Sequence, residues 1–466
     1  MELPEDLKSR LQQYGQAQVI AAWDRLAPNA RPGLLQQIRD LDLELLHQLY
    51  TQRDKTFALP APESIRPVPI TQLSAADTKE RSLGEEALRR GEVAVLMVAG
   101  GQGSRLGFEH PKGMFAIGPV SNNSLFQIHA EKVLALRHRY GRAVPFLILT
   151  SHATHDETAQ YFADHHFFGL SAEEVFFFQQ GTMPALDQAT GQLLFEAPGR
   201  LFLSPNGHGG TLTALADSGL LGQLRGQGIR QVFYFQVDNP LVKIADALFL
   251  GHHLAERAEV SSKIVPKETP SDKLGNLVLV NGRCAMIEYS DLPDHLARET
   301  DEKGALRIRA GSPAIHIFGV DFLGRVTQGK ARMPYHVARK KVPCIDASGK
   351  LVQPAQENAL KFELFIFDAL PLTDRWTVVE TSRREEFAPL KNATGADSPE
   401  QVRQAISDLA GDWLERAGVE VPRRADGSAA VPLEVSPLYA LDAEELKRKV
   451  DPALRIQGPT YLKNAV

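Results

Sequence analysis

A short apolar segment that ends abruptly in glycine constrains the fold of this 466-residue chain more than any other feature. Residues 93–99, VAVLMVA, form a near-continuous apolar run of strand length, which predicts a strand buried in a parallel sheet. The chain continues with Gly100, Gly101 and Gly103, which can turn tightly and bring backbone N–H groups close to a bound anion or base. We therefore expect a ligand-binding loop directly after a buried strand.

Two basic side chains point to phosphate as the ligand of this loop. Arg105 can make bidentate hydrogen bonds to phosphate and Lys112 adds a compact charge, and each charge-assisted bond contributes about 1.5–3 kcal/mol. The dinucleotide fingerprint would need glycine where Leu106 stands, and the Walker loop would need Gly-Lys-Ser/Thr, whereas the order here is Pro111, Lys112, Gly113. A polyphosphate site of another class is favoured.

The rest of the chain predicts an α/β fold with a mixed sheet flanked by helices. The predicted strands lie at residues 144–150, 175–179, 231–237 and 312–319, and the predicted helices at residues 125–140, 154–165, 212–221 and 358–370. Alternation of strand and helix is typical of a parallel sheet with right-handed crossovers. Residues 260–288 alternate between apolar and polar side chains and predict added antiparallel strands.

Three parts of the chain differ in pattern. Residues 1–90 carry leucines at helical spacing and predict a helical N-terminal region. Residues 91–384 hold the predicted sheet. Residues 385–466 combine charged helices with short apolar stretches and predict a small C-terminal domain.

The composition limits the kind of partner. Hydrophobic residues make up 43% of the chain and charged residues 23%, which is ordinary for a globular protein of two or three domains. The formal net charge of −5 gives no overall attraction to nucleic acid or to an anionic membrane, so phosphate affinity must be local. The first residues lack a signal-peptide pattern, no apolar run approaches the length of about 18 residues that spans a bilayer, and only two cysteines occur. We expect a cytoplasmic protein.

Polar side chains follow two other predicted strands. Asp238 comes directly after the strand at 231–237, and ligands in open α/β sheets bind beyond the carboxyl ends of the strands. An isolated aspartate in this position more often only caps a turn. Glu288 and Tyr289 end the alternating segment, and a carboxylate and a phenol can bond to sugar hydroxyls. A solvated strand residue is an equally good interpretation of Glu288.

A second glycine loop, SPNGHGG at residues 204–210, precedes a predicted helix. Its glycines allow close backbone approach, and the helix N-terminus favours negative charge. His208 is the only ionisable side chain within it, and between glycines a ligand contact is at least as well supported as simple solvation. Just before a nearby glycine turn, Gln179 and Gln180 offer paired donors and acceptors suited to the edge of a base.

Together these motifs resemble those of the eukaryotic-type UDP-sugar pyrophosphorylase superfamily. The first loop matches its signature A-G-G-x-G-[ST]-R-L-G…P-K, and FQQGTMP resembles its F-x-Q-G-x-x-P element, whose glutamine recognises uracil. The blocks QVDNPLVKIAD, IEYSDL, KKVPCIDASGKLVQP, KFELFIFD and REEFAPLKN are most similar to UDP-N-acetylhexosamine (UDP-N-acetylglucosamine) pyrophosphorylases. The resemblance covers roughly residues 90–395 and implies a Rossmann-like, GT-A-like nucleotidyltransferase fold with its catalytic domain at residues 91–384.

The resemblance implies UTP and a hexose 1-phosphate as substrates and Mg²⁺ as cofactor. The implied nucleotide-binding residues are Ala99, Gly100, Gly101, Gly103, Gln180, Gly207 and Asp238. The implied sugar-binding residues are His208, Gly275, Glu288 and Tyr289. Arg105 and Lys112 would stabilise the triphosphate and the leaving pyrophosphate, Lys361 would draw the two phosphates together, and Asp238 would hold Mg²⁺.

Two departures from the family pattern concern the sugar. His208 stands where N-acetylhexosamine enzymes usually carry asparagine, and residues 312–315, Ser-Pro-Ala-Ile, replace N-x-A-N. The implied reaction joins UTP to N-acetylglucosamine 1-phosphate, and the alternative is the same reaction with glucose 1-phosphate or galactose 1-phosphate. A non-catalytic nucleotide-sugar sensor on the same fold is a further alternative, because fold alone does not imply activity. Retention of Arg105, Lys112, Asp238 and Lys361 argues against the sensor.

Overall fold

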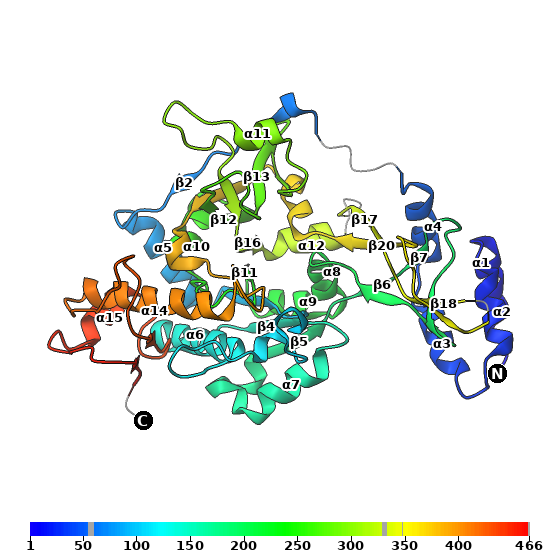
Figure 1. The fold of residues 1–466 in the computed structure, drawn as a ribbon, viewed down its shortest axis with the longest axis horizontal. Helices are drawn as coiled ribbons and strands as arrows, with labels where there is room; N and C mark the ends of the chain where they lie inside the picture. Colours follow the sequence, from blue (N-terminus) through cyan, green and yellow to red (C-terminus); the bar gives the residue numbers. More distant parts are fainter. Residues whose placement is uncertain (55–59, 329–332, 347, 465–466) are drawn as a thin grey trace. The chain divides into compact units, whose positions relative to one another are not determined.

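The computed structural model describes residues 1–54, 60–328, 333–346 and 348–464 (Figure 1). The chain forms two compact units, each assembled from separated segments. Unit 1 comprises Met1–Leu59, Gln180–Thr213 and Arg332–Asp368, and unit 2 comprises Pro60–Gln179, Ala214–Ala331 and Ala369–Val466. Each unit contains segments that are far apart in the sequence. The predicted domain boundaries near residues 90 and 384 stay a prediction.

A mixed sheet forms the centre of unit 2. β3 (Val93–Val98) pairs in parallel with β4 (Phe146–Thr150) on one side and with β11 (Gln231–Gln236) on the other, and β4 pairs in parallel with β5 (Val175–Gln179). β16 (His316–Gly319) runs antiparallel to β11. The parallel half and the antiparallel addition confirm the predicted mixed α/β fold.

The sheet continues beyond β16 through strands that the alternating sequence predicts. β12 (Val260–Pro266) pairs with β16 and with β15 (Ala310–Ser312), and β13 (Gly275–Val280) pairs with β15. The remaining strands of this sheet are β1 (Ile65–Pro67), β2 (Thr71–Gln72), β14 (Arg283–Ile287) and β21 (Trp376–Glu380). The predicted strand at 312–319 is therefore two strands, since Pro313 cannot donate to a ladder and Ala314 adopts a φ of 58°.

Helices flank this sheet and bury its apolar side chains. The helices of unit 2 are α5 (Thr78–Arg90), α6 (Leu125–Tyr140), α7 (His155–Asp164), α9 (Leu220–Gly226), α10 (Ala247–Ala255), α11 (Asp294–Arg298), α12 (Val320–Gln328), α13 (Arg383–Glu386), α14 (Pro399–Arg416) and α15 (Ala443–Lys449). Side chains of β3, β4 and β11 pack with α6 in one buried cluster that includes Val95, Ile148 and Phe126. The predicted helix at 212–221 is two helices, α8 (Gly210–Asp217) and α9, because Gly219 takes a left-handed conformation between them.

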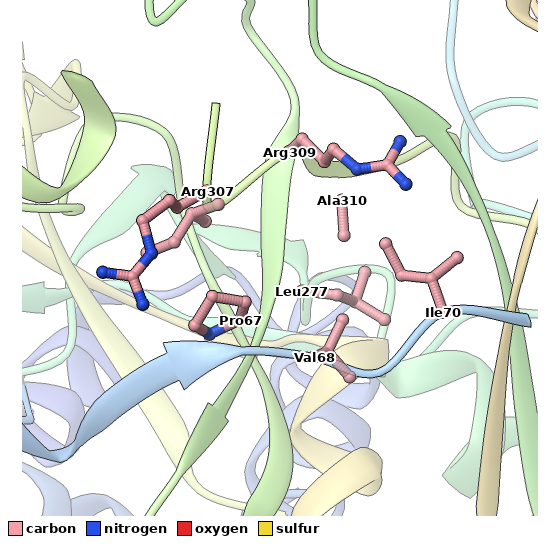
Figure 2. A pocket seen from close by; sticks show the side chains of 8 residues that line it. Pro67, Val68, Ile70, Leu277, Arg307, Arg309 and Ala310 are labelled. Carbon is pink, nitrogen blue, oxygen red and sulfur yellow. The ribbon is translucent and has the colours of Figure 1, made fainter. Parts of the chain in front are cut away.

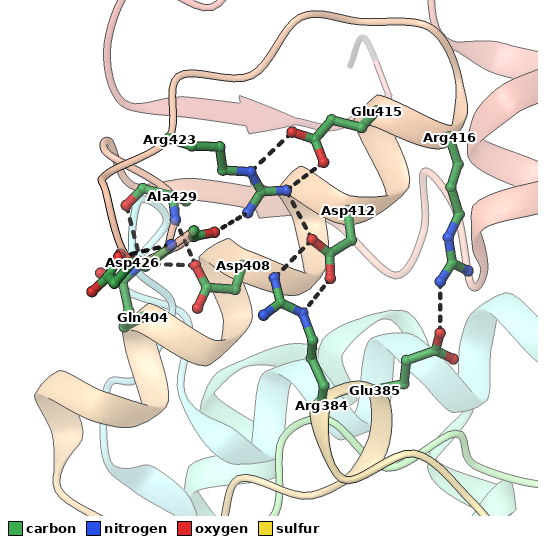
Figure 3. Close-up of polar contacts among 12 residues, drawn as sticks. Arg384, Glu385, Gln404, Asp408, Asp412, Glu415, Arg416, Arg423, Asp426 and Ala429 are labelled. Carbon is green, nitrogen blue, oxygen red and sulfur yellow. Dashed lines mark hydrogen bonds and ion pairs between the residues drawn. The ribbon is translucent and has the colours of Figure 1, made fainter.

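The C-terminal part of unit 2 has its own apolar cluster. α14 and α15 pack against the parallel pair β22 (Leu433–Val435) and β23 (Thr460–Leu462). An ion-pair network joins α14 to the segment before it: Arg384 makes a bidentate pair with Asp412, which also accepts from Arg423 (Figure 3). Because Arg384 lies on α13, the network fixes the end of the sheet region to the C-terminal helices.

Unit 1 consists of four helices packed on short sheets. The helices are α1 (Glu5–Gln13), α2 (Ala17–Arg25), α3 (Arg31–Arg39) and α4 (Leu43–Thr51), and the strands are β6 (Thr182–Pro184), β7 (Leu186–Asp187), β8 (Phe195–Ala197), β9 (Arg200–Leu201), β10 (Leu203–Pro205), β17 (Tyr335–Lys340), β18 (Cys344–Ile345), β19 (Leu351–Val352) and β20 (Ala359–Leu364). The leucines and Trp23 of the helices pack with Leu360 and Phe362 of β20. The helical N-terminal region is thus as predicted.

The segment at 358–370 is not the predicted helix. It forms β20 followed by a 3-10 turn, η6 (Ile366–Leu372). Leu360, Phe362 and Leu364 are buried while Lys361 and Glu363 are partly exposed, which is the two-residue period of a strand. Among the described residues, no helix is long and apolar enough to cross a membrane.

Candidate active site

The first glycine loop begins at the carboxyl end of β3. The parallel register aligns Val98 with Gln236 of β11, and Val237 N–H donates to Val98 O at 3.0 Å, so Ala99 and Asp238 lie at the same edge of the sheet. The loop then closes on itself: Gly103 N–H donates to His110 O at 2.9 Å and Lys112 N–H to Gly101 O at 3.0 Å. The structure therefore brings the predicted phosphate loop and the predicted metal ligand together.

Glycine is suited to two positions of this loop for different reasons. A Cβ on Gly103 would lie 2.8 Å from the Phe108 ring and from Phe108 O, so packing requires glycine there. A Cβ on Gly101 would have no atom within 4 Å, which leaves the backbone open to a ligand. The Arg105 side chain is exposed and, among the described residues, makes no hydrogen bond or ion pair. Its guanidinium is available for an anion.

Lys112 and Asp238 form the charged centre of the site. The Lys112 Nζ atom lies 3.8 Å from Asp238 Oδ2 and donates to Leu390 O at 3.3 Å. Leu390 N–H donates to Asp238 O at 2.8 Å, so the segment between α13 and α14 holds both residues in place. Both charged side chains are largely buried, with exposed fractions of 19% and 12%, which strengthens their interaction with a ligand.

Lys391 is a basic residue of this site that sequence reasoning did not single out. It directly follows Leu390, the residue bonded to both Lys112 and Asp238, and its Nζ atom lies 5.9 Å from the Phe387 ring centroid. Lys391 lies in the block REEFAPLKN, and the only sequence signal for it was a lysine close to a proline, which favours a turn. The hydrogen bonds of Leu390 show that this turn reaches the Asp238 loop.

The predicted sugar-binding residues of unit 2 gather at the starts and ends of neighbouring strands. Gly275 pairs with Ser312 across β13 and β15, and Asn276 pairs with Ile287, which precedes Glu288. β15 also pairs with Val265 at the carboxyl end of β12, so this group shares the sheet edge of Asp238. Tyr289 is 46% exposed, as a side chain that meets a ligand would be.

Unit 1 brings together the predicted base and second-loop residues. Asn206 N–H donates to Gly181 O at 3.0 Å, and the Gln180 side-chain amide donates to Gly207 O. A Cβ on Gly207 would lie 2.4 Å from Leu364 O, so the loop packs directly on the end of β20. Gln180 and Gly207 are thus neighbours, as a shared uracil site requires.

His208 is held as a neutral side chain in an aromatic setting. Its Nδ1 atom accepts from Ile366 N–H at 3.2 Å, and its ring stacks on Phe365 with centroids 5.4 Å apart. Burial, and to a smaller extent the nearby His336, lowers the pKa of His208 to about 4. Because Nδ1 is an acceptor, the proton of the neutral ring is on Nε2, which leaves one N–H donor for a ligand.

Lys361 lies on the strand β20 and not on the predicted helix. It occupies the middle of β20, opposite Ala338 of β17, and its Nζ atom lies 4.9 Å from the Phe202 ring centroid. Partial burial lowers its pKa. The residue belongs to unit 1, whereas Lys112 and Asp238 belong to unit 2, so its catalytic role remains a prediction.

The metal assignment rests on a single carboxylate. Among the described residues, no group of three or more His, Cys, Asp or Glu side chains could hold a metal ion. Mg²⁺ in nucleotide-transferring sites commonly takes one or two carboxylates together with substrate phosphates and water. Asp238, buried beside Lys112 at the phosphate-loop edge, fits that pattern.

A cavity of about 240 Å³ lies elsewhere on unit 2 (Figure 2). Pro67, Val68 and Leu277 form an apolar floor, and Figure 2 shows the Arg307 and Arg309 side chains directed to opposite sides of it. Arg309 is paired with Glu380 at 2.6 Å. The cavity includes none of the predicted ligand-binding residues.

Comparison with known proteins agrees with this arrangement. A family model described as UTP–glucose-1-phosphate uridylyltransferase matches residues 44–397. The chain is 36% identical to UDP-N-acetylglucosamine diphosphorylase 2 of Arabidopsis thaliana over 95% of this chain and 90% of that protein. It is also 36% identical to the UDP-N-acetylglucosamine pyrophosphorylase of Saccharomyces cerevisiae, over 95% of this chain and 96% of the yeast protein.

A solved structure shows the same fold. The uridine diphosphate N-acetylglucosamine pyrophosphorylase of Trypanosoma brucei, crystallised with an inhibitor, matches with a TM-score of 0.81 and 26% identity, covering 96% of this chain and 95% of that one. The fold, the phosphate loop and the family match define a nucleotidyltransferase. The chain belongs to the UTP–glucose-1-phosphate uridylyltransferase family and is a UDP-sugar pyrophosphorylase, which confirms the resemblance.

Proposed function

We propose that this enzyme joins UTP to N-acetylglucosamine 1-phosphate, giving UDP-N-acetylglucosamine and pyrophosphate. The observation that carries the choice of sugar is the 36% identity, over 95% of the chain, to proteins named for this sugar in a plant and a yeast. The family match over residues 44–397 includes every residue proposed to contact the sugar. A location in the cytoplasm remains the expectation from the sequence.

In the proposed mechanism, an oxygen of the sugar 1-phosphate attacks the α-phosphorus of UTP in line, and the bond from that phosphorus to the pyrophosphate oxygen breaks. No covalent enzyme intermediate is needed, so the protein acts by positioning and by neutralising charge. Arg105 and Lys112 bind the β- and γ-phosphates, and Lys391 adds a third cation beside them. Gln180 and the first loop bind the base, while Lys361 is proposed to draw the two substrates' phosphates together.

Asp238 is the proposed Mg²⁺ ligand. When bound, the ion would neutralise charge between the triphosphate and the attacking phosphate. The contribution of the chain is to hold the Asp238 carboxylate 3.8 Å from Lys112 at the edge of the phosphate loop, with the backbone of the loop fixed by Leu390.

The setting of His208 supports an N-acetyl sugar as well as a plain hexose. Its single Nε2–H can donate either to an acetamido carbonyl or to a 2-hydroxyl, so the residue type alone does not choose between them. Phe365 and Phe367 flank the ring at centroid distances of 5.4 and 5.7 Å and offer apolar surface to an acetamido methyl group. Glucose 1-phosphate or galactose 1-phosphate remains the second candidate because of His208 and residues 312–315.

Side-by-side turnover decides between these sugars. Pyrophosphate release is measured with UTP, Mg²⁺ and each of the three hexose 1-phosphates, with the nucleotide sugar identified by mass spectrometry. We expect the highest kcat/KM with N-acetylglucosamine 1-phosphate. A higher value with glucose or galactose 1-phosphate would refute the choice of sugar. His208→Asn sharpens the test, because an amide can donate to the acetamido carbonyl and accept from its N–H, and should raise the preference for the N-acetyl sugar.

A further inference from the structure

One partly buried lysine lies next to the loop that carries Asp238. Lys132 is in the middle of α6, and its ammonium donates to Pro240 O at 2.5 Å and to Val242 O at 2.8 Å. These two carbonyls belong to the turn that follows β11. The lysine therefore contacts the main chain of the turn two and four residues beyond Asp238.

A second side chain of α6 holds the other side of the same turn. The His129 Nε2 atom lies 3.0 Å from Val237 O, and within the described part of the chain its Nδ1 atom has no hydrogen-bond partner. Nε2 must therefore carry the proton and donate it to the carbonyl. His129 and Lys132 are one helical turn apart, so one face of α6 binds carbonyls on both sides of Asp238.

The opposite side of the turn is bonded to the segment that carries Leu390. The Asn239 side chain donates to Glu386 O at 2.7 Å and accepts from Ala388 N–H at 3.1 Å. Together with the bond from Leu390 to Asp238 O, these contacts bond the backbone of the turn on both sides, while the Asp238 carboxylate faces Lys112.

Burial of an ammonium costs stability unless it is compensated. Lys132 contacts carbonyls rather than carboxylates. Burial lowers the pKa of its ammonium to about 7. The more distant Glu386 acts to raise this pKa, and Lys243 acts to lower it. An apolar side chain of similar volume would fill this site at no such cost. What a lysine provides and an apolar side chain lacks is a pair of directed bonds to the turn.

We propose that Lys132 is a positioning residue for the reaction. Its two hydrogen bonds fix the turn that follows Asp238 and so set where the Asp238 carboxylate meets the metal–nucleotide complex. The inference rests on the proposed role of Asp238. Lys132 acts through the main chain of the turn and touches no substrate.

Lys132→Met tests this because it keeps an unbranched side chain as far as Cε and removes the ammonium that makes both hydrogen bonds. We expect kcat to fall about tenfold, since small misplacements of a reacting group are costly. We also expect the Mg²⁺ concentration for half-maximal turnover to rise about tenfold, as for other residues that orient metal ligands. Binding provides a readout that needs no turnover. In calorimetry, the Mg²⁺ concentration that gives a half-maximal gain in UTP affinity should rise about tenfold in the variant, while the affinity measured in EDTA stays that of the wild type.

Two further variants keep the test decisive if Lys132→Met folds poorly. Lys132→Arg retains donors for both carbonyls and should restore the Mg²⁺ midpoint to within threefold of the wild type, an order-of-magnitude expectation. Lys132→Gln, with one short amide, should fall between. Arg139→Met is the matched control, because Arg139 is on the same helix but pairs with Asp442 and Glu445; it should lower the thermal midpoint and leave the Mg²⁺ dependence unchanged.

A wild-type Mg²⁺ dependence in folded Lys132→Met, or in Lys132→Gln where the methionine variant does not fold, would overturn the inference. Asp238→Asn separates this result from a failure of the proposed function. If Asp238→Asn alters the Mg²⁺ dependence and the Lys132 variants do not, only the positioning role is wrong. If Asp238→Asn has no effect on it, the metal assignment is wrong as well.

Discussion

The two glycine loops of this enzyme use the same residue for opposite purposes. In the first loop, a Cβ on Gly101 would meet no atom within 4 Å, whereas in the second loop a Cβ on Gly209 would lie 2.6 Å from main-chain atoms of Leu364 and Phe365. Gly210 is equally restricted, because its Cβ would lie 1.9 Å from Asn206 Oδ1. At Gly101 of the first loop, glycine leaves room for a ligand, whereas at Gly209 and Gly210 it permits close packing, as it does at Gly103.

The difference extends to charge. The first loop carries Arg105 and Lys112 and adjoins Asp238, so its groups can act on phosphate directly. The second loop carries one ionisable side chain, His208, which is buried and neutral. The comparison teaches that a glycine-rich motif does not by itself reveal a phosphate site; the charges around it do.

The largest effect is expected from removing a charge of the first loop. Lys112→Met should lower kcat by about 10²–10³-fold, as loss of a directed cation at a developing charge does. The thermal midpoint should change little, because the contacts of the Lys112 ammonium are long, at 3.8 Å to Asp238 Oδ2 and 3.3 Å to Leu390 O. Steady-state kinetics and thermal unfolding measure both. The control is Lys79→Met, because Lys79 is an exposed lysine of α5. If the kcat of Lys112→Met were within about fivefold of the kcat of this control, the role assigned to Lys112 would be contradicted.

The second loop should respond to added volume with a loss of stability. Gly209→Ala forces its Cβ against main-chain atoms that cannot rotate away, and we expect a loss of about 1–3 kcal/mol in the free energy of unfolding. Urea unfolding measures it. Gly33→Ala, at the start of α3 in the same unit, is the matched control, since its Cβ would meet nothing within 4 Å. Equal stability of the two variants would mean that the second loop is not tightly packed.

The first loop should show the reverse behaviour on the same substitution. Gly101→Ala should leave the thermal midpoint unchanged, because its Cβ enters open space, yet weaken UTP binding by about tenfold where the ligand must approach the backbone. Calorimetry of UTP with the variant provides the value. If Gly101→Ala destabilised the protein as much as Gly209→Ala, the contrast between the loops would be lost.

The sequence was sufficient for the parts of the site that are local. The buried strand, the glycine loop and Asp238 follow from a β-strand pattern and from the rule that ligands lie at the carboxyl ends of parallel strands, and the register of β3 with β11 agrees with this. The helix α6 and the strand β5 have the predicted bounds, because each is a strongly periodic or continuous apolar run.

Long-range contacts explain what the sequence could not predict. Residues 358–370 fit both a helix and a strand, and only packing of Phe362 against the helices of unit 1 selects the strand. Lys391 lies 153 residues after Asp238 by their numbers, and the hydrogen bond of Leu390 to that turn has no local signal. The contacts of Lys132 are of the same kind, since nothing in the sequence of α6 indicates which carbonyls this lysine meets.

The smallest expected effect concerns the neutral histidine of the second loop and depends on pH. The folded protein binds a proton at His208 only near pH 4, whereas an unfolded chain binds it near pH 6.5. As the pH falls from 6.5 toward 4, the unfolded state gains protons that the folded state excludes, so the free energy of unfolding decreases by up to about 1.4 kcal/mol per pH unit for this residue.

The buried His129 and His253 act in the same direction, because burial lowers their pKa values to about 3 and about 4. In the wild type, the slope of the free energy of unfolding against pH should therefore approach the value for three protons taken up on unfolding, apart from carboxylates that titrate at the lower end of this range. His208→Asn should reduce this number by one. Urea unfolding between pH 5 and 6.5, which lies within the window set by these pKa values, measures the difference. An unchanged slope would show that His208 takes up its proton in the folded protein, and the second loop would then be charged like the first when it meets a sugar phosphate.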